Sequence, residues 1–146
     1  MAGKRRRRAK AGYSLLEILI VLTIIALIAA LVGPRLFAQL DRSKVTTARV
    51  QARSLESALE TMRVDINRYP TQQEGLALLM QADPKTVTGW AGPYLGAAVP
   101  NDPWGRPYLY EPPKSEDRQP AVVSLGADGK PGGAGNSADV RNTAGT

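Results

Sequence analysis

Residues 12–34 are GYSLLEILIVLTIIALIAALVGP, an apolar run in which Glu17 is the only charged side chain. As an α-helix, the 21 residues from Tyr13 to Gly33 measure about 31 Å, which matches the ~30 Å hydrocarbon core of a bilayer. The run is therefore predicted to span a membrane. A carboxylate within such a span costs roughly 2.5–3.5 kcal/mol and usually marks a partner, whereas a plain membrane anchor has no use for one.

A block of positive charge precedes the apolar run. Residues 1–12 hold six of the 19 lysines and arginines and none of the 13 acidic residues, so the rest of the chain is formally neutral. The positive-inside rule predicts a cytoplasmic N-terminus, with the chain after the span on the far side of the membrane. A nucleic-acid-binding protein would spread basic residues over its folded part, and this class is therefore excluded.

The chain lacks the residue types on which many enzymes and metal sites depend. It has no cysteine and no histidine, which excludes disulfides, thiolate chemistry and the commonest transition-metal ligand. No Gly-x-Ser-x-Gly, Ser-x-x-Lys or paired-carboxylate arrangement stands out. We therefore expect a protein without enzymatic activity.

The residues at the start of the apolar run carry a family resemblance. A basic leader, Gly12, the aromatic Tyr13 and Glu17 five positions after the glycine resemble the class III signal of type IV pilins and pseudopilins. The resemblance implies that a prepilin peptidase cuts between Gly12 and Tyr13 and methylates the new amine of Tyr13. It also implies that Glu17 pairs with this amine on a neighbouring subunit. Tyr13 and Ser14 stand where the family usually has Phe and Thr.

Electrostatics favours the same role for Glu17. Cleavage would create a cation at Tyr13, and a buried carboxylate is tolerated where another charge neutralises it. One helix satisfies both charges poorly, whereas adjacent helices place one subunit's amine against the next subunit's carboxylate. The alternatives are that Glu17 lies at the headgroup level of a plain anchor, or that the run is a cleavable secretory signal. A secretory signal fits poorly, because the run is long and ends without a good small-x-small cleavage site.

Beyond Gly33 and Pro34 the apolar pattern becomes one-sided. A proline inside a helix removes one hydrogen bond, so Pro34 is predicted to let the helix bend or unwind on assembly. The helix is predicted to have a membrane half at 13–33 and an amphipathic half at 34–68. The apolar positions of the second half recur at steps of three and four, and they are Val45, Ala48, Ala52, Leu55, Leu59, Met62 and Ile66.

Residues 69–146 are predicted to form a small head. Thr71, followed by Glu74 three residues later, has the spacing of a capping box and predicts a short second helix. The turn residues Asp102, Pro103 and Gly105 then precede a predicted strand at 107–111, and a second strand is predicted at 121–125. The predicted fold class is α+β, with the long N-terminal helix packed on a small antiparallel sheet that carries a glycine-rich C-terminal loop.

The glycine-rich loop is a candidate calcium site. Residues 125–139, LGADGKPGGAGNSAD, hold two carboxylates, an amide and a hydroxyl, and calcium takes six to eight oxygen ligands. The spacing matches neither an EF-hand nor a P-loop. A polar tail with an Asp-Gly turn is the alternative interpretation.

Four separate motifs make the family resemblance more specific. RYPTQQEGLALLM, GWAGPYL, NDPWGRPYLYEPP and SLGADGKPGGAGNSADV together resemble the major pseudopilins of type II secretion systems. The resemblance implies a calcium site with Asp128 and Asp139 as side-chain ligands, Leu125 as a carbonyl ligand, and Asn136 or Ser137 contributing. The loop has fewer acidic residues than its relatives tend to have, which predicts weaker calcium binding.

The resemblance implies a structural subunit that is made as an inner-membrane precursor and polymerises into a periplasmic pseudopilus. The fibre would drive export of folded proteins across the outer membrane. The implied partners are copies of the chain itself, the prepilin peptidase, minor pseudopilins, the assembly platform and inner-membrane lipid. One alternative is a type IV pilin for adhesion, motility or DNA uptake, which usually has a cysteine pair. The other is a monomeric membrane-anchored periplasmic module, which leaves Glu17 without a purpose.

Overall fold

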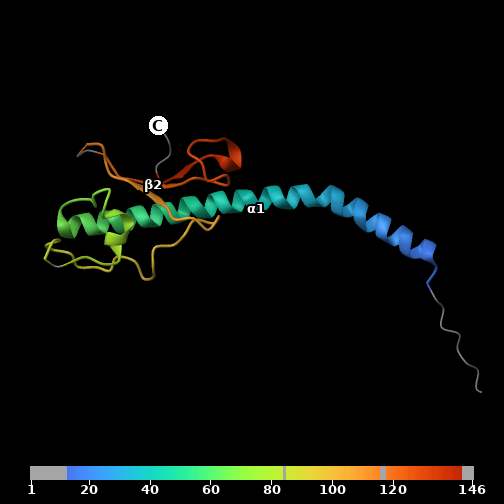
Figure 1. Cartoon of the computed structure of the whole chain (residues 1–146), viewed down its shortest axis with the longest axis horizontal. Coiled ribbons are helices and arrows are strands. Elements are labelled where there is room, and N and C mark those ends of the chain that lie inside the picture. The colour runs from blue at the N-terminus through green and yellow to red at the C-terminus, as the bar shows by residue number, and fades with distance from the viewer. Residues whose placement is uncertain (1–12, 84, 116–117, 143–146) are drawn as a thin grey trace, which may run out of the picture. The chain divides into compact units, whose positions relative to one another are not determined.

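The computed structural model describes residues 13–83, 85–115 and 118–142. The chain forms two compact units, one ending at Ala38 and the other beginning at Gln39. In chain order, the described elements are α1 (Leu15–Ile66), η1 (Gly75–Leu79), β1 (Leu109–Glu111), β2 (Ala121–Ser124), η2 (Gly135–Ser137) and β3 (Val140–Arg141) (Figure 1).

The helix α1 has 52 residues and confirms the predicted long N-terminal helix. It ends at Ile66 because Asn67 takes the left-handed conformation, with φ 58°, that commonly terminates helices. Pro34 lies inside α1, and the helix continues past it in this single chain. Unwinding near Pro34 on assembly therefore stays a prediction. Within the described residues, α1 is the one helix long and apolar enough to cross a membrane.

The core of the second unit is built on one face of α1. Leu55, Leu59 and Met62 are at most 1% exposed, as the three- and four-residue spacing predicts. Val45 and Ile66, at the two ends of the predicted stripe, are only half-buried. Ala58, which the sequence analysis did not place on this face, is also buried, because it follows Leu55 by three positions.

The sheet has three strands in the order β1-β2-β3, and both pairings are antiparallel. Tyr110 lies opposite Val122 in the first pair, and Ser124 lies opposite Val140 in the second. Figure 1 shows β2 running beside the C-terminal part of α1, and Val122 belongs to the same buried cluster as Leu59. The predicted antiparallel sheet is confirmed, with β3 as a third strand that was not predicted.

Two buried tyrosines of the β1 region connect the sheet to the rest of the unit. The Tyr108 hydroxyl donates a hydrogen bond to Gln51 Oε1 at 2.7 Å, and the Tyr110 hydroxyl donates one to the Pro70 carbonyl at 2.9 Å. Burial raises the pKa of Tyr108 to about 12 and also raises the pKa of Tyr110, so both hydroxyls stay protonated donors at neutral pH.

The predicted capping box is present, but the predicted second helix is shorter than expected. The Thr71 backbone N–H donates to Glu74 Oε2 at 2.8 Å, and the Glu74 N–H donates to Thr71 Oγ1 at 3.3 Å. Gly75 then has φ +53°, a left-handed conformation that an α-helix cannot contain. The segment forms the five-residue 3₁₀ helix η1, which buries Leu76 and Leu79 as predicted, together with Leu78. Met80 is half-buried.

Candidate functional site

The start of α1 is organised by Ser14. Its carbonyl accepts hydrogen bonds from the Glu17 N–H at 3.0 Å and the Ile18 N–H at 3.2 Å, and its hydroxyl accepts one from the Leu16 N–H at 3.3 Å. Ser14 is therefore the N-cap of the helix. Glu17 lies in the first turn, where the positive end of the helix dipole favours a carboxylate.

The first unit leaves its apolar side chains uncovered. Leu15 is 91% exposed, Leu27 73% and Phe37 70%, and the segment shows no buried face within residues 13–38. A surface of this kind marks a membrane or protein contact. Among the described residues, Glu17 takes part in no ion pair. The predicted cleavage residue Gly12 lies outside the described residues, whereas Tyr13 precedes the helix and is 79% exposed.

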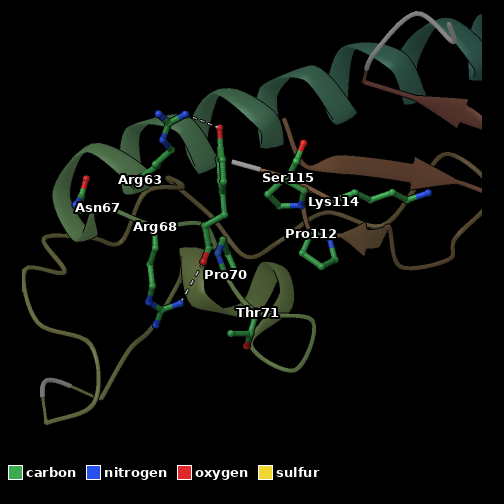
Figure 2. Close-up of a pocket in the computed structure, with 10 residues that line it drawn as sticks. Arg63, Asn67, Arg68, Pro70, Thr71, Pro112, Lys114 and Ser115 are labelled. Carbon is green, nitrogen blue, oxygen red and sulfur yellow. Dashed lines mark hydrogen bonds between the residues drawn. The ribbon is translucent and has the colours of Figure 1, made fainter. Parts of the chain in front are cut away.

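A surface pocket of about 600 Å³ lies beside the end of α1, but its arginines already have internal partners. Figure 2 shows that Arg63 and Arg68 point away from each other along the pocket wall. Arg63 lies 5.2 Å from the Tyr69 ring centroid and donates to the Tyr69 hydroxyl at 3.1 Å. Arg68 makes two 2.7 Å hydrogen bonds to the Glu74 carboxylate, and this pairing lowers the pKa of Glu74 to about 2. These contacts support the fold and give no reason to assign a ligand.

The turn before β1 is organised by the carboxylate of Asp102, for which the sequence predicts a turn but not burial. Asp102 is 4% exposed. Its Oδ1 accepts hydrogen bonds from the backbone N–H groups of Trp104 at 3.0 Å and Arg106 at 2.8 Å. Its Oδ2 accepts one from the Ser124 hydroxyl, at the end of β2, at 2.6 Å. The motif Asn-Asp-Pro-Trp-Gly-Arg indicates a turn, but it carries no signal of the distant Ser124.

The C-terminal loop, residues 125–139, closes on itself through backbone hydrogen bonds. The Ala127 N–H donates to the Asn136 carbonyl at 3.1 Å, and the Asp139 N–H donates to the Gly132 carbonyl at 3.1 Å. Gly126 has φ +62°, and a Cβ there would lie 2.6 Å from the Ala138 carbonyl oxygen. A glycine is required at this position because the two ends of the loop approach each other closely.

The predicted calcium ligands of the loop differ in how far their oxygen atoms are already hydrogen-bonded. Asp139 Oδ2 accepts the Gly132 N–H at 3.1 Å, while its Oδ1 is buried without a hydrogen-bond partner among the described residues. The Leu125 carbonyl accepts the Gly129 N–H at 3.2 Å, which leaves one lone pair free. Asp128 is exposed, and its Oδ1 accepts the Lys130 N–H at 3.1 Å.

The two remaining predicted ligands lie in the turn η2. The Asn136 side chain donates to Asp41 Oδ2 at 3.5 Å, and the Ser137 N–H donates to the Ala134 carbonyl at 3.1 Å. No cluster of three or more acidic side chains that could hold a metal occurs within residues 13–83, 85–115 and 118–142. The clearest feature of the loop for cation binding is the buried Asp139 Oδ1, which has no hydrogen-bond partner among the described residues.

Comparisons with known proteins agree over most of the chain. Residues 35–143 match the family described as "Type II secretion system (T2SS), protein G", and residues 7–33 match the "Prokaryotic N-terminal methylation motif". The chain is 37% identical over 140 residues to the type II secretion system core protein G of Pseudomonas aeruginosa, covering 94% of this chain and 97% of that protein. It is 33% identical over 140 residues to the core protein G of Vibrio cholerae, covering 94% of each chain.

A solved structure is similar as well. It is the crystal structure of the major pseudopilin from the type 2 secretion system of enterohaemorrhagic Escherichia coli. The match has a TM-score of 0.55 and 28% sequence identity, and it covers 75% of this chain and 94% of that one. The methylation-motif match ends at residue 33, inside the apolar part of α1, and the family match over residues 35–143 covers the rest of α1 and the sheet. The chain belongs to the type II secretion system protein G family and is a structural pseudopilin subunit, not an enzyme.

Proposed function

We propose that the chain is cut after Gly12, is N-methylated at Tyr13, and polymerises through Glu17 into a short periplasmic pseudopilus that drives export of folded proteins across the outer membrane. The observation that carries this proposal is the apolar surface of residues 13–38, which holds a single carboxylate in its first turn. Such a surface needs a membrane before assembly and neighbouring helices after it.

The same surface indicates the partners. The precursor lies in the inner membrane with its head in the periplasm, as the charge of the leader indicates. There it meets the prepilin peptidase, the assembly platform, minor pseudopilins and further copies of itself. The type IV pilin alternative is disfavoured by the family match over residues 35–143.

Mass spectrometry of the mature N-terminus tests the processing step. In cells that contain a prepilin peptidase, we expect the chain to begin with N-methyl-Tyr13, and in cells without the enzyme the leader should remain. A chain that keeps its leader in the presence of the peptidase, or that begins elsewhere than Tyr13, would contradict the proposal and favour a simple membrane anchor.

We also propose that the C-terminal loop binds calcium weakly. The supporting observations are the buried, unpaired oxygen of Asp139 and the free carbonyl capacity of Leu125. Asp128 and one of Asn136 or Ser137 would complete the protein ligands, with water in the remaining positions. Two carboxylates place the expected affinity toward the millimolar range of extracellular calcium modules.

Calcium removal is expected to lower the melting temperature of a soluble head that lacks residues 1–33. This fragment retains the whole described core, because the second compact unit begins at Gln39. With calcium at ten times its dissociation constant, binding contributes about 1.4 kcal/mol, which corresponds to a shift of roughly 5 °C. Differential scanning fluorimetry with and without chelator measures this shift, and Asp139→Asn should remove it. A melting temperature that does not respond to calcium would rule out the site.

A further inference from the structure

The side chain of Arg106 reaches into the C-terminal loop from a different part of the head. Its backbone is fixed in the turn before β1, where its N–H donates to Asp102 Oδ1 and its carbonyl accepts the Asp102 N–H at 2.7 Å. Its side chain is about two-thirds buried, with 34% exposed. The direction of the guanidinium is therefore set by a rigid turn and by packing.

The guanidinium contacts the loop at two places. Its Nη2 donates a hydrogen bond to the carbonyl of Gly126, and its Nη1 lies directly over Gly129, where a Cβ would collide with it. Its Nε lies 3.8 Å from Asp102 Oδ2, so the buried carboxylate balances part of its charge. Hydrogen bonds from charged donors are about twice as strong as neutral ones.

The charge of the loop complements this cation. Residues 125–139 contain Asp128, Asp139 and one cation, Lys130, which leaves a formal charge of −1. A loop of this composition, rich in glycine, has a high conformational entropy to lose on closing. The guanidinium of Arg106, fixed beside Gly126 and Gly129 at the neck of the loop, offsets that entropic cost without an ion from solution.

We infer that Arg106 is a built-in cation that holds the C-terminal loop closed when no metal ion is bound. The guanidinium joins the turn before β1 to the neck of the loop at Gly126 and Gly129. The contacts of Arg106 at Gly126 and Gly129 lie beside Leu125 and Asp128, two of the proposed calcium ligands, but Arg106 itself is not a ligand. Calcium would then add to the stability of a loop that is already closed.

Hydrogen exchange of the full mature chain in detergent and chelator tests the inference. In Arg106→Gln, the amides of Ala127, Gly129 and Asp139, which carry the loop's backbone hydrogen bonds, should exchange about ten-fold faster. Amides of β1 and β2 should keep their wild-type rates. Unchanged loop rates would overturn the inference. An equal acceleration in β1 would also overturn it, because Arg106 would then support the whole head.

A matched pair of glycine variants checks the contact itself. Gly129 has φ +69° and Gly135 has φ +60°, so alanine strains the backbone similarly at both, but only at Gly129 does the new Cβ meet Arg106. Loop exchange should therefore be about ten-fold faster in Gly129→Ala than in Gly135→Ala. That difference should vanish when Arg106→Gln is added to both. Equal rates in the two single variants, or a difference that persists without Arg106, would contradict the contact.

Adding calcium to Arg106→Gln separates the two proposals. If calcium restores the slow exchange of the loop, the result supports both the inference about Arg106 and the proposed calcium site. If exchange stays fast, the result supports the inference about Arg106 and rules out the proposed calcium site. If the wild-type loop exchanges fast in chelator and slowly with calcium, the metal alone closes the loop and the inference about Arg106 is wrong.

Discussion

Glu17→Ala is expected to abolish fibre formation while leaving cleavage and the fold of the head unchanged. The charge pair proposed between Glu17 and the amine of Tyr13 would lie among packed apolar helices, where removing one partner leaves the other charge buried and uncompensated. Breaking a pair of this kind costs about 3–5 kcal/mol, so polymer yield should fall by at least ten-fold. Sedimentation of sheared fibres, with immunoblotting of pellet and supernatant, measures the yield.

The chain provides a control on the same helix. The hydroxyl of Thr23 donates to its own helix, at the Leu19 carbonyl, at 2.7 Å, and it therefore needs no partner from another subunit. Thr23→Ala should assemble normally, and Glu17→Gln should fail as Glu17→Ala does, because it keeps the shape and removes the charge. Wild-type fibre levels in Glu17→Ala would refute the proposed contact.

Asp102→Ala is expected to lower the free energy of unfolding of the head by about 3 kcal/mol. The buried carboxylate accepts two backbone N–H groups and the Ser124 hydroxyl, and the substitution leaves these donors without partners. Each unsatisfied buried donor costs roughly 1–3 kcal/mol before the structure relaxes. The loss should appear as a lower urea midpoint with an unchanged m value.

Asp83→Ala is the matched control for this experiment. Asp83 Oδ1 accepts a backbone N–H two positions later, from Lys85, much as Asp102 accepts that of Trp104, but Asp83 is exposed. Water replaces the lost acceptor there, so the change in unfolding free energy should stay within about 0.5 kcal/mol. Equal effects of the two substitutions would show that Asp102 contributes as a local turn residue and does not connect the turn to β2.

The features of this protein that are local in sequence could be predicted well. The long helix, its buried stripe and the reciprocal bonds of Thr71 and Glu74 depend on residues three or four positions apart. The leader and Glu17 motif likewise needed no fold to be recognised. The prediction differed in detail at the second helix, which is the five-residue 3₁₀ helix η1 and begins at Gly75 with φ +53°.

The sequence by itself determined the apolar helix with its lone acid, the one-sided second half and the two main strands, because periodicity and hydrogen bonding between neighbours fix these features. Only the tertiary structure decided which distant groups meet. Asp102 accepts a hydrogen bond from Ser124, Arg106 donates one to Gly126, and β3 pairs with β2. The first two contacts arise because the antiparallel pairing of β1 with β2, in which Leu109 lies opposite Val123, brings the turn before β1 beside the residues that follow β2. No pattern within either segment encodes that approach.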